Sequence, residues 1–374
     1  MNILQFTLPH HPSMGGIYTA QEDFRNVLNA PIVEVVPSSL LNQTQGDYQI
    51  LFSGIGFLEK YGVPINIISL MSTLNTLKVD IVIIHSLFHI HSLIGYWFAK
   101  KNGIPYLFVP HGTLDPYVFS YRKTQKFLWM NLLGQRIIDN SSAVICSTSR
   151  ESEKACKFLK TANIEICPWG IHEIDSIETS ICKKELRNKL NIPSEQKILI
   201  FLGRLNRMKR ILETANAFEE LRPQGWTLLI VGPPEEVSIS EHIKSISDGQ
   251  LICYHPPVNS SEKWRFLAGS DAFINLSYRE NFGYAVAEAA LVGLPILISD
   301  GVDIYPMLQA ADAADVISIN SESEIINGIN RFLNKPLEEL EKMGLNAKKI
   351  AVERLSHNSF SSNIKSMVGK YSNL

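Results

Sequence analysis

The sequence of 374 residues contains no uninterrupted apolar run of the roughly 18 residues that a membrane-spanning helix needs. Its N-terminus, Met1–Leu4, lacks the basic region and the cleavage site of a signal peptide, and we expect it to begin a strand. No two of the five cysteines have C-x-x-C spacing, which argues against a zinc site or a disulfide framework. These absences favour a protein of the reducing cytoplasm.

The chain also lacks a strong charge of either sign. Its 35 Lys and Arg residues stand against 37 Asp and Glu residues, which gives a net charge of −2 at pH 7. A general nucleic-acid binder needs a basic face to displace phosphate counterions, so we expect no nucleic-acid partner. Apolar residues make up 45% of the sequence, which is enough for a large core, and the length favours two or three domains.

Short apolar segments alternate with helical patterns along the chain. We expect strands at 3–8, 79–85, 105–110 and 143–148 in the first half, and at 197–203, 226–232, 271–277, 295–299 and 315–319 in the second. Fully apolar strands separated by helices indicate parallel sheets that are buried on both faces. Because a polar stretch at 171–191 separates the two sets, we predict two doubly wound α/β domains joined near residues 170–195, with ligands at the carboxyl ends of their strands.

A basic loop follows the strand expected at 197–203. It begins at Gly203 and carries Arg204, Lys209 and two further arginines, Arg207 and Arg210. Four cations within seven residues at a strand end suit an anion such as a diphosphate, since Arg forks onto phosphate oxygens and Lys adds a point charge. The alternative is a solvated basic loop.

Two glutamates flank the start of an expected helix in the second half. Gly283 lets a ligand approach the helix N-terminus, whose free N–H groups suit a phosphate. Glu288 lies five residues further on, about 7.5 Å along the helix axis, where its carboxylate can accept two ribose hydroxyls. Glu280 precedes the helix and can hold hydroxyls of a second sugar. Alternatively, one Glu stabilises the helix and the other is solvated, although Glu288 lies among Ala and Val and needs a partner there.

These segments together resemble the retaining family 4 glycosyltransferases with the GT-B fold. Glu280 and Glu288 match that family's E-x7-E motif, which continues into the Gly-Leu-Pro of residues 293–295. Gly203-Arg204-Leu205 and Lys209 match its donor-phosphate motif, about 75 residues upstream. The segment 298–304 is similar to one common in a polysaccharide-building branch of the family.

The first half carries matching features. Gly15 and Gly16 follow the first strand, as in the family's acceptor-side loop, and the segment 110–116, Pro-His-Gly-Thr-Leu-Asp-Pro, is similar to a block of the same branch. In that family a His at the position of His111 lies beside the donor sugar and the acceptor. Without the resemblance, paired glycines mark only a turn and a lone His is more often structural.

The resemblance implies roles for individual residues. Arg204 and Lys209 would neutralise the donor diphosphate, Glu288 would hold the ribose, and Glu280 and His111 would orient the donor sugar. The catalytic residues implied are His111, Arg204, Lys209 and Glu280, and the donor-binding residues are Gly15, Gly16, Gly203, Asn281, Phe282, Gly283, Tyr284, Ala285, Glu288 and Val258. We expect no metal, although His85, His89 and His91 cluster in a way that suggests one, because no Asp, Glu or Cys nearby completes that site.

The resemblance also implies an organisation and a reaction. It implies two Rossmann-like doubly wound parallel-sheet domains that face a central cleft: an acceptor-binding domain at 1–172, which a last helix at about 355–374 rejoins, and a donor-binding domain at 190–354. The expected enzyme is a cytoplasmic, hexosyltransferase-like and metal-independent protein without a cofactor. It would move a sugar from a nucleotide-diphosphate sugar to a glycan or lipid-linked glycan, with retention, in surface polysaccharide or lipopolysaccharide biosynthesis.

Three alternatives remain from the sequence. The chain could be a nucleotide-sugar epimerase or hydrolase of the same fold, or a non-catalytic partner subunit that keeps the fold.

The basic, aromatic stretch at 117–129 could rest on the inner face of a membrane or, as the simpler alternative, form a helix that covers the sheet.

Overall fold

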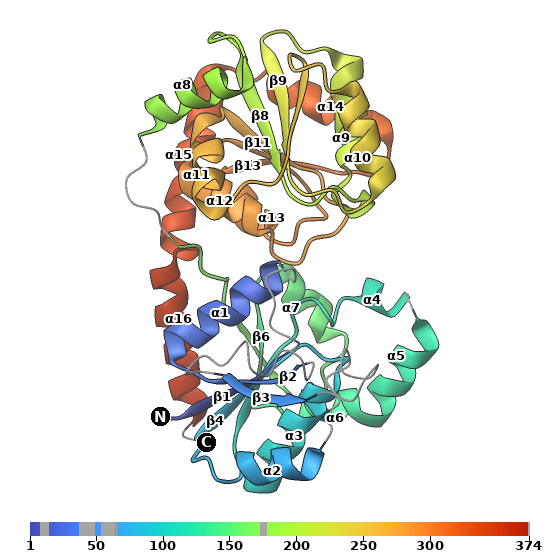
Figure 1. The fold of residues 1–374 in the computed structure, drawn as a ribbon, viewed down its shortest axis with the longest axis vertical. Coiled ribbons are helices and arrows are strands. Elements are labelled where there is room, and N and C mark those ends of the chain that lie inside the picture. The colour runs from blue at the N-terminus through green and yellow to red at the C-terminus, as the bar shows by residue number, and fades with distance from the viewer. Residues whose placement is uncertain are drawn as a thin grey trace. The chain divides into compact units, whose positions relative to one another are not determined.

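The computed structural model describes residues 1–7, 15–36, 49–53, 64, 66–120, 122–172 and 178–372. It divides into two compact units: unit 1 comprises Met1–Gly170 and Phe360–Leu374, and unit 2 comprises Ile171–Ser359. Each unit is built on one parallel sheet with helices on both faces (Figure 1). No helix of the described residues is both long enough and apolar enough to cross a membrane.

The sheet of unit 1 has the strand order β3-β2-β1-β4-β5-β6-β7. Its strands are β1 (Ile3–Phe6), β2 (Ile32–Val36), β3 (Gln49–Ser53), β4 (Ile81–His85), β5 (Tyr106–Val109), β6 (Ala143–Cys146) and β7 (Asn163–Ile166). Every residue of β1, β4, β5 and β6 is buried, which explains why these central strands were predictable as apolar runs. The strands β2, β3 and β7 were not predicted.

Helices cover both faces of this sheet. They are α1 (Gly16–Leu28), α2 (Ile67–Leu74), α3 (Ile90–Asn102), α4 (Pro116–Ser120), α5 (Lys123–Trp129), a π-helical turn (Met130–Gly134), α6 (Gln135–Asp139), α7 (Ser149–Cys156) and most of α16 (His357–Ser372). The C-terminal helix belongs to the core: the ring of Phe24 in α1 lies 5.3 Å from that of Phe360 and 5.6 Å from that of Trp169. Unit 1 is therefore completed by the end of the chain.

Unit 2 repeats the same winding, with the order β10-β9-β8-β11-β12-β13. Its strands are β8 (Lys197–Leu202), β9 (Trp226–Val231), β10 (Ile252–His255), β11 (Ala272–Asn275), β12 (Ile296–Ser299) and β13 (Ala314–Ile317). All were predicted within a few residues except β10, an edge strand that is only partly buried. In both units the strand order reverses beside the first strand, which is the doubly wound arrangement predicted from the sequence.

The helices of unit 2 form two layers (Figure 1). One face carries α9 (Ile211–Leu221), α10 (Val237–Ile246) and α14 (Glu322–Leu333), and the other carries α8 (Thr179–Leu190), α11 (Ser260–Gly269), α12 (Tyr284–Val292) and α15 (Leu337–Arg354). A short helix, α13 (Tyr305–Ala310), lies between β12 and β13 in the chain.

Helix α8 lies in the polar stretch that the sequence suggested as a connection. Arg187 donates to Asp271 Oδ2 at 2.6 Å, and the same oxygen accepts the N–H of Ile198 at the start of β8, at 2.8 Å. Lys183 also pairs with this carboxylate. Charges at 171–191 therefore dock a helix onto unit 2 instead of marking a solvated linker.

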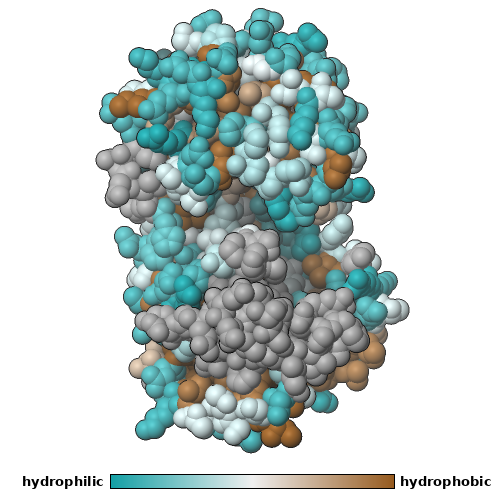
Figure 2. Space-filling view, in the orientation of Figure 1, coloured by the Kyte–Doolittle hydropathy of each residue, from teal (hydrophilic) through white to brown (hydrophobic). Residues whose placement is uncertain are grey.

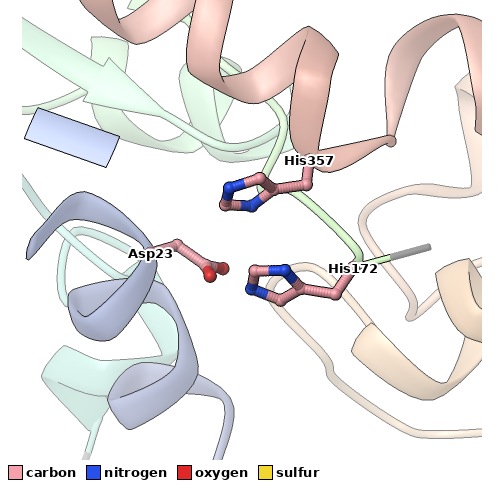
Figure 3. A group of neighbouring side chains, drawn as sticks. All are labelled: Asp23, His172 and His357. Atoms are coloured by element: carbon pink, nitrogen blue, oxygen red, sulfur yellow. The ribbon is translucent and has the colours of Figure 1, made fainter. Parts of the chain in front are cut away.

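Two segments at the margin of unit 2, one around Ile171 and one around His357, run side by side. Ile171 donates its N–H to the carbonyl of Leu355 at 2.7 Å, and His357 donates to the carbonyl of Ile171 at 3.0 Å. Figure 3 shows the rings of His172 and His357 next to each other, with centroids 4.1 Å apart; the third side chain drawn, Asp23, belongs to unit 1.

The loops after β8 and β9 approach so closely that only glycine fits at Gly232. This residue has a φ of +155°, and a Cβ there would lie 1.9 Å from the carbonyl oxygen of Gly203. We expect Gly232→Ala to lower the free energy of unfolding by about 1–3 kcal/mol or more, because the backbone has to move apart. Gly225→Ala is the control: it also has a positive φ, of +74°, but its Cβ meets no described atom within 4 Å. Urea unfolding with equal losses for both variants would contradict this account.

Candidate active site

The predicted donor residues gather where the order of strands in unit 2 reverses. The basic loop follows β8, the glutamate segment follows β11, and these two strands are neighbours in the sheet. In a doubly wound sheet this switch point is where the two adjoining loops separate and leave room for a ligand. The structure therefore brings together two motifs that lie about 75 residues apart in the sequence.

A buried ion pair joins these two loops. Lys209 Nζ lies 2.7 Å from Glu280 Oε1, and both side chains are less than one-fifth exposed. The second oxygen of Glu280 accepts hydrogen bonds from Asn275 Nδ2 at 2.9 Å and Ser277 Oγ at 3.1 Å. Burial alone would raise the pKa of Glu280, but the Lys209 ammonium and these hydrogen bonds outweigh it and hold the pKa below its ordinary value. The carboxylate is therefore ionised and weakly basic.

The other cations of the basic loop differ in their surroundings. Arg204 is 58% exposed and pairs with Glu235 at 2.8 Å, so a ligand can compete for it. Arg207 pairs with Glu236, and Arg210 donates to the carbonyl of Ile319 at 2.9 Å. These two arginines stabilise the loop, which leaves Arg204 and Lys209 as the cations that the resemblance assigned to the donor.

Asn206 explains how the loop holds its form. Its side chain accepts the N–H of Lys209 at 3.1 Å and thereby caps the single 3₁₀ turn Arg207–Lys209. Its amide also donates to Glu235, the partner of Arg204. The backbone of Lys209 is thus fixed by the same residue that braces the carboxylate beside Arg204.

The helix N-terminus predicted to bind a phosphate is present. Helix α12 starts at Tyr284, and its N-cap is Gly283, which has a φ of +91° and no side chain that could cap the first turn. A Cβ on Gly283 would approach Val302 to 3.0 Å. Phe282 is buried and its ring lies 5.2 Å from that of Tyr284. Asn281 and Ala285 flank this turn, so the segment 281–285 presents backbone groups and the positive end of the helix dipole.

Glu288 lies about one turn into α12, among its buried residues, and has a partner that the sequence did not identify. Lys263 of α11 pairs with Glu288 Oε1 at 2.5 Å. The other oxygen, Oε2, has no hydrogen-bond partner in the part of the chain that the structure describes. Burial raises the pKa of Glu288, and Lys263 opposes this only in part. Val258, predicted near the nucleotide base, is half-buried in the loop that leads into α11.

In unit 1, His111 follows β5 in a left-handed turn. Its φ is +48° and that of Gly112 is +73°. The N–H of Gly112 donates to the buried carboxylate of Glu151 at 2.7 Å, and the other Glu151 oxygen accepts the N–H and the hydroxyl of Ser147. Sequence reasoning missed Glu151, although the Thr-x-x-Glu spacing from residue 148 is a known helix-start signal.

The predicted glycines and histidines of unit 1 take different positions. Gly15 is the N-cap of α1 with a φ of +61°, and Gly16 begins that helix; the preceding residues 8–14 lie outside the described ones. His91 is buried and donates to the carbonyl of His85 at 2.7 Å, and burial lowers its pKa to about 3. His85 itself contacts His111, so two of the clustered histidines serve hydrogen bonds within unit 1.

Comparisons with known proteins match both units of the chain to glycosyltransferases. The family described as Glycosyltransferase Family 4 matches residues 40–173, and the family described as Glycosyl transferases group 1 matches residues 183–350. The glycosyltransferase TuaC of Bacillus subtilis, named for teichuronic acid biosynthesis, is 24% identical over 54% of this chain and 48% of its own length. Alpha-monoglucosyldiacylglycerol synthase of Acholeplasma laidlawii is 23% identical over 70% of this chain and 68% of its own. The chain thus spans about half of TuaC.

Solved structures share the fold over the full length. Alr3699/HepE of Anabaena, solved in complex with UDP, aligns over 99% of this chain and 100% of its own with a TM-score of 0.77 and 16% identity. A trehalose-6-phosphate synthase studied for glycosyl transfer with retention aligns over 99% of both chains with a TM-score of 0.71 and 14% identity. With two family matches that cover most of the sequence and this fold, the chain belongs to the family 4 glycosyltransferases of the GT-B fold.

Proposed function

We propose that this glycosyltransferase moves a hexose from a nucleotide-diphosphate sugar to a glycan or lipid-linked glycan, with retention of the anomeric configuration and without a metal. The observation that carries this proposal is the buried Lys209–Glu280 pair at the switch point of unit 2, close in the chain to the start of α12. It places a cation, an anion and a helix dipole within adjacent loops. The complexes of HepE with UDP and UDP-glucose support a uridine nucleotide as the first donor to test.

The cations would act on the leaving group. As the bond between the sugar and the diphosphate breaks, negative charge grows on the diphosphate, and Arg204 and Lys209 stabilise it without a metal ion. The backbone amides of Gly283, Tyr284 and Ala285 add partial positive charge at the same place. The departing phosphate oxygen takes the proton of the acceptor hydroxyl on the same face, so no residue of the enzyme has to form a covalent intermediate.

The glutamates would bind hydroxyls. Glu280 is ionised and already holds Lys209, Asn275 and Ser277, which makes it a weak nucleophile and a good acceptor for sugar hydroxyls. Glu288 Oε2 is open to a ligand and suits the two ribose hydroxyls, while Lys263 keeps the other oxygen compensated. His111 of unit 1 would orient the donor sugar.

The surface of unit 1, the unit expected to bind the acceptor, suggests contact with a membrane. Helices α4 and α5 contain no fully buried residue, although Phe119 of α4 and Trp129 of α5 pack against the core of unit 1, as the simpler alternative expects. Phe127 and Leu128 are 66% and 59% exposed, and Arg122 and Lys123 are exposed at the start of α5. Figure 2 shows hydrophobic atoms at the edge of unit 1 that carries this helix. We propose that α5 rests on the anionic inner face of the cytoplasmic membrane, where a lipid-linked acceptor would be found.

Nucleotide binding tests the donor site directly. UDP, GDP and ADP and their common sugars should be added to the wild type and to Glu288→Ala in a thermal unfolding assay. We expect one nucleotide to raise the melting temperature of the wild type and to have little effect on the variant, because ribose loses its acceptor. Glu241→Ala, an exposed glutamate of α10, should respond like the wild type. A full shift in Glu288→Ala would contradict the ribose role, and no shift with any nucleotide would favour a non-catalytic partner subunit.

Lys209→Ala should reduce kcat/KM for glycosyl transfer at least tenfold, because the charge that stabilises the leaving diphosphate is lost. Lys184→Ala, an exposed lysine of α8, is the matched control and should keep full activity. Steady-state kinetics with product identification also separates the alternatives, since a hydrolase releases free sugar and an epimerase returns an isomeric donor. Unchanged turnover in a folded Lys209→Ala protein would remove Lys209 from the mechanism.

Vesicle sedimentation tests the membrane proposal. We expect the wild type to bind vesicles rich in phosphatidylglycerol and to be released by salt, since both apolar burial and basic charge contribute. The double variant Phe127→Ser/Leu128→Ser should bind at least tenfold more weakly. Leu345→Ser, at a position of α15 in unit 2 that is 71% exposed, controls for the loss of any surface apolar group. A wild type that stays in the supernatant with anionic vesicles would refute the proposal.

A further inference from the structure

A line of hydrogen bonds runs through the core of unit 1 to His111. Gln5 Nε2 donates to the carbonyl of Ala30 at 3.0 Å, and Gln5 Oε1 lies 2.9 Å from His85 Nε2. His85 Nδ1 lies 2.8 Å from His111 Nε2. Gln5 and His85 have no exposed surface, and they lie on β1 and β4, the neighbouring strands at which the order of the sheet reverses.

The direction of each bond in this line follows from its first member. A carbonyl oxygen only accepts, so the amide nitrogen of Gln5 must face Ala30 and its oxygen must face His85. His85 Nε2 therefore carries a proton and donates it. If His85 carries only this one proton, its Nδ1 is an acceptor. The proton between the two rings then belongs to Nε2 of His111.

This arrangement leaves one atom of His111 for a ligand. Burial lowers the pKa of His111 to about 3, so its ring holds a single proton, the one on Nε2. Its Nδ1 then has a lone pair, and no hydrogen bond to Nδ1 occurs among the residues that the structure describes. The ring planes of His85 and His111 differ by 18°, and their centroids are 5.1 Å apart.

The backbone fixes the same ring from the other side. The left-handed turn at His111 and Gly112 is tied to Glu151 by the 2.7 Å bond from the Gly112 N–H. The ring of Trp169 lies 5.5 Å from that of His111. Side chain and main chain are thus both held, and the orientation of Nδ1 is set before any substrate arrives.

We propose that Gln5 and His85 are positioning residues that hold His111 as its Nε2–H tautomer, so that its Nδ1 accepts a hydrogen bond from a substrate hydroxyl. The identification of that hydroxyl as a sugar hydroxyl rests on the proposed function. A neutral acceptor of this kind favours hydroxyl or amine donors, and it repels phosphate and carboxylate oxygens because two acceptors would face each other. His111 would therefore bind a hydroxyl of the sugar, whereas Arg204 and Lys209 would bind the diphosphate.

Long-range proton–nitrogen NMR spectra of histidine-labelled protein report the tautomer without any substrate. We expect the His111 ring, assigned by comparison with His111→Gln, to be protonated at Nε2 alone. Gln5→Met removes the acceptor of His85 and keeps a side chain of similar volume. His85 is then free to carry its proton on Nδ1, so we expect His111 to populate both tautomers and kcat to fall about tenfold. The dissociation constant of UDP should stay within about twofold, because Gln5 is not one of its predicted contacts.

Two further variants complete the test. Gln135→Met makes the same exchange in α6, where Gln135 bonds to Asp139 and the carbonyl of Phe158, and should leave the His111 spectrum and kcat unchanged. His85→Phe keeps a ring but removes both nitrogens, and it replaces Gln5→Met if that variant does not fold. A wild-type His111 protonated at Nδ1, or an unchanged tautomer in both folded variants, would overturn the proposal. Because the spectra need no donor, a failure of the transferase assignment leaves this result intact.

Discussion

One buried ion pair determines how the loops at the reversal point of unit 2 are built. Glu280 can remain ionised inside unit 2 because Lys209 lies 2.7 Å away, and the two residues belong to loops that follow adjacent strands. Breaking such a pair leaves an uncompensated buried charge, which is strongly unfavourable. The loops after β8 and β11 are therefore tied to each other where the sheet reverses its order. The cap by Asn206 and the bonds from Asn275 and Ser277 maintain that tie.

The two units solve the same problem with different side chains. A doubly wound sheet buries its strands completely, so polar groups that reach its carboxyl edge need partners within the core. In unit 2 Asn275, at the end of β11, supports Glu280. In unit 1 Gln5 of β1 and His85 of β4 support His111. In each case a neutral, buried side chain next to the reversal point orients the residue that the family resemblance assigned to the sugar.

Burial explains which parts could be predicted from the sequence. The fully buried strands β1, β4, β5 and β6 are mostly apolar and were recognisable, whereas β7 and β10 lie at sheet edges, are partly exposed and were missed. The inner strand β2, which a glutamate interrupts, was missed as well. Motif residues such as Lys209 and Glu288 were identified because their spacing is specific. Their partners were not: the need of Glu288 for a partner was evident, but only the packing of α11 on α12 selects Lys263. Gln5 is a polar residue in an otherwise apolar strand, and this could have indicated a buried hydrogen bond to another polar side chain.

The return of the last helix to unit 1 has a consequence for how the protein is made. Phe24 and Trp169 pack on Phe360, which is synthesised only after the whole of unit 2. During translation all of Ile171–Ser359 leaves the ribosome first, so unit 2 has its whole sequence available while the first unit still lacks its closing helix. Domains generally fold as units, and exposed apolar surface attracts chaperones and favours aggregation. The nascent first unit therefore needs protection for longer than the unit that follows it, although its synthesis began earlier.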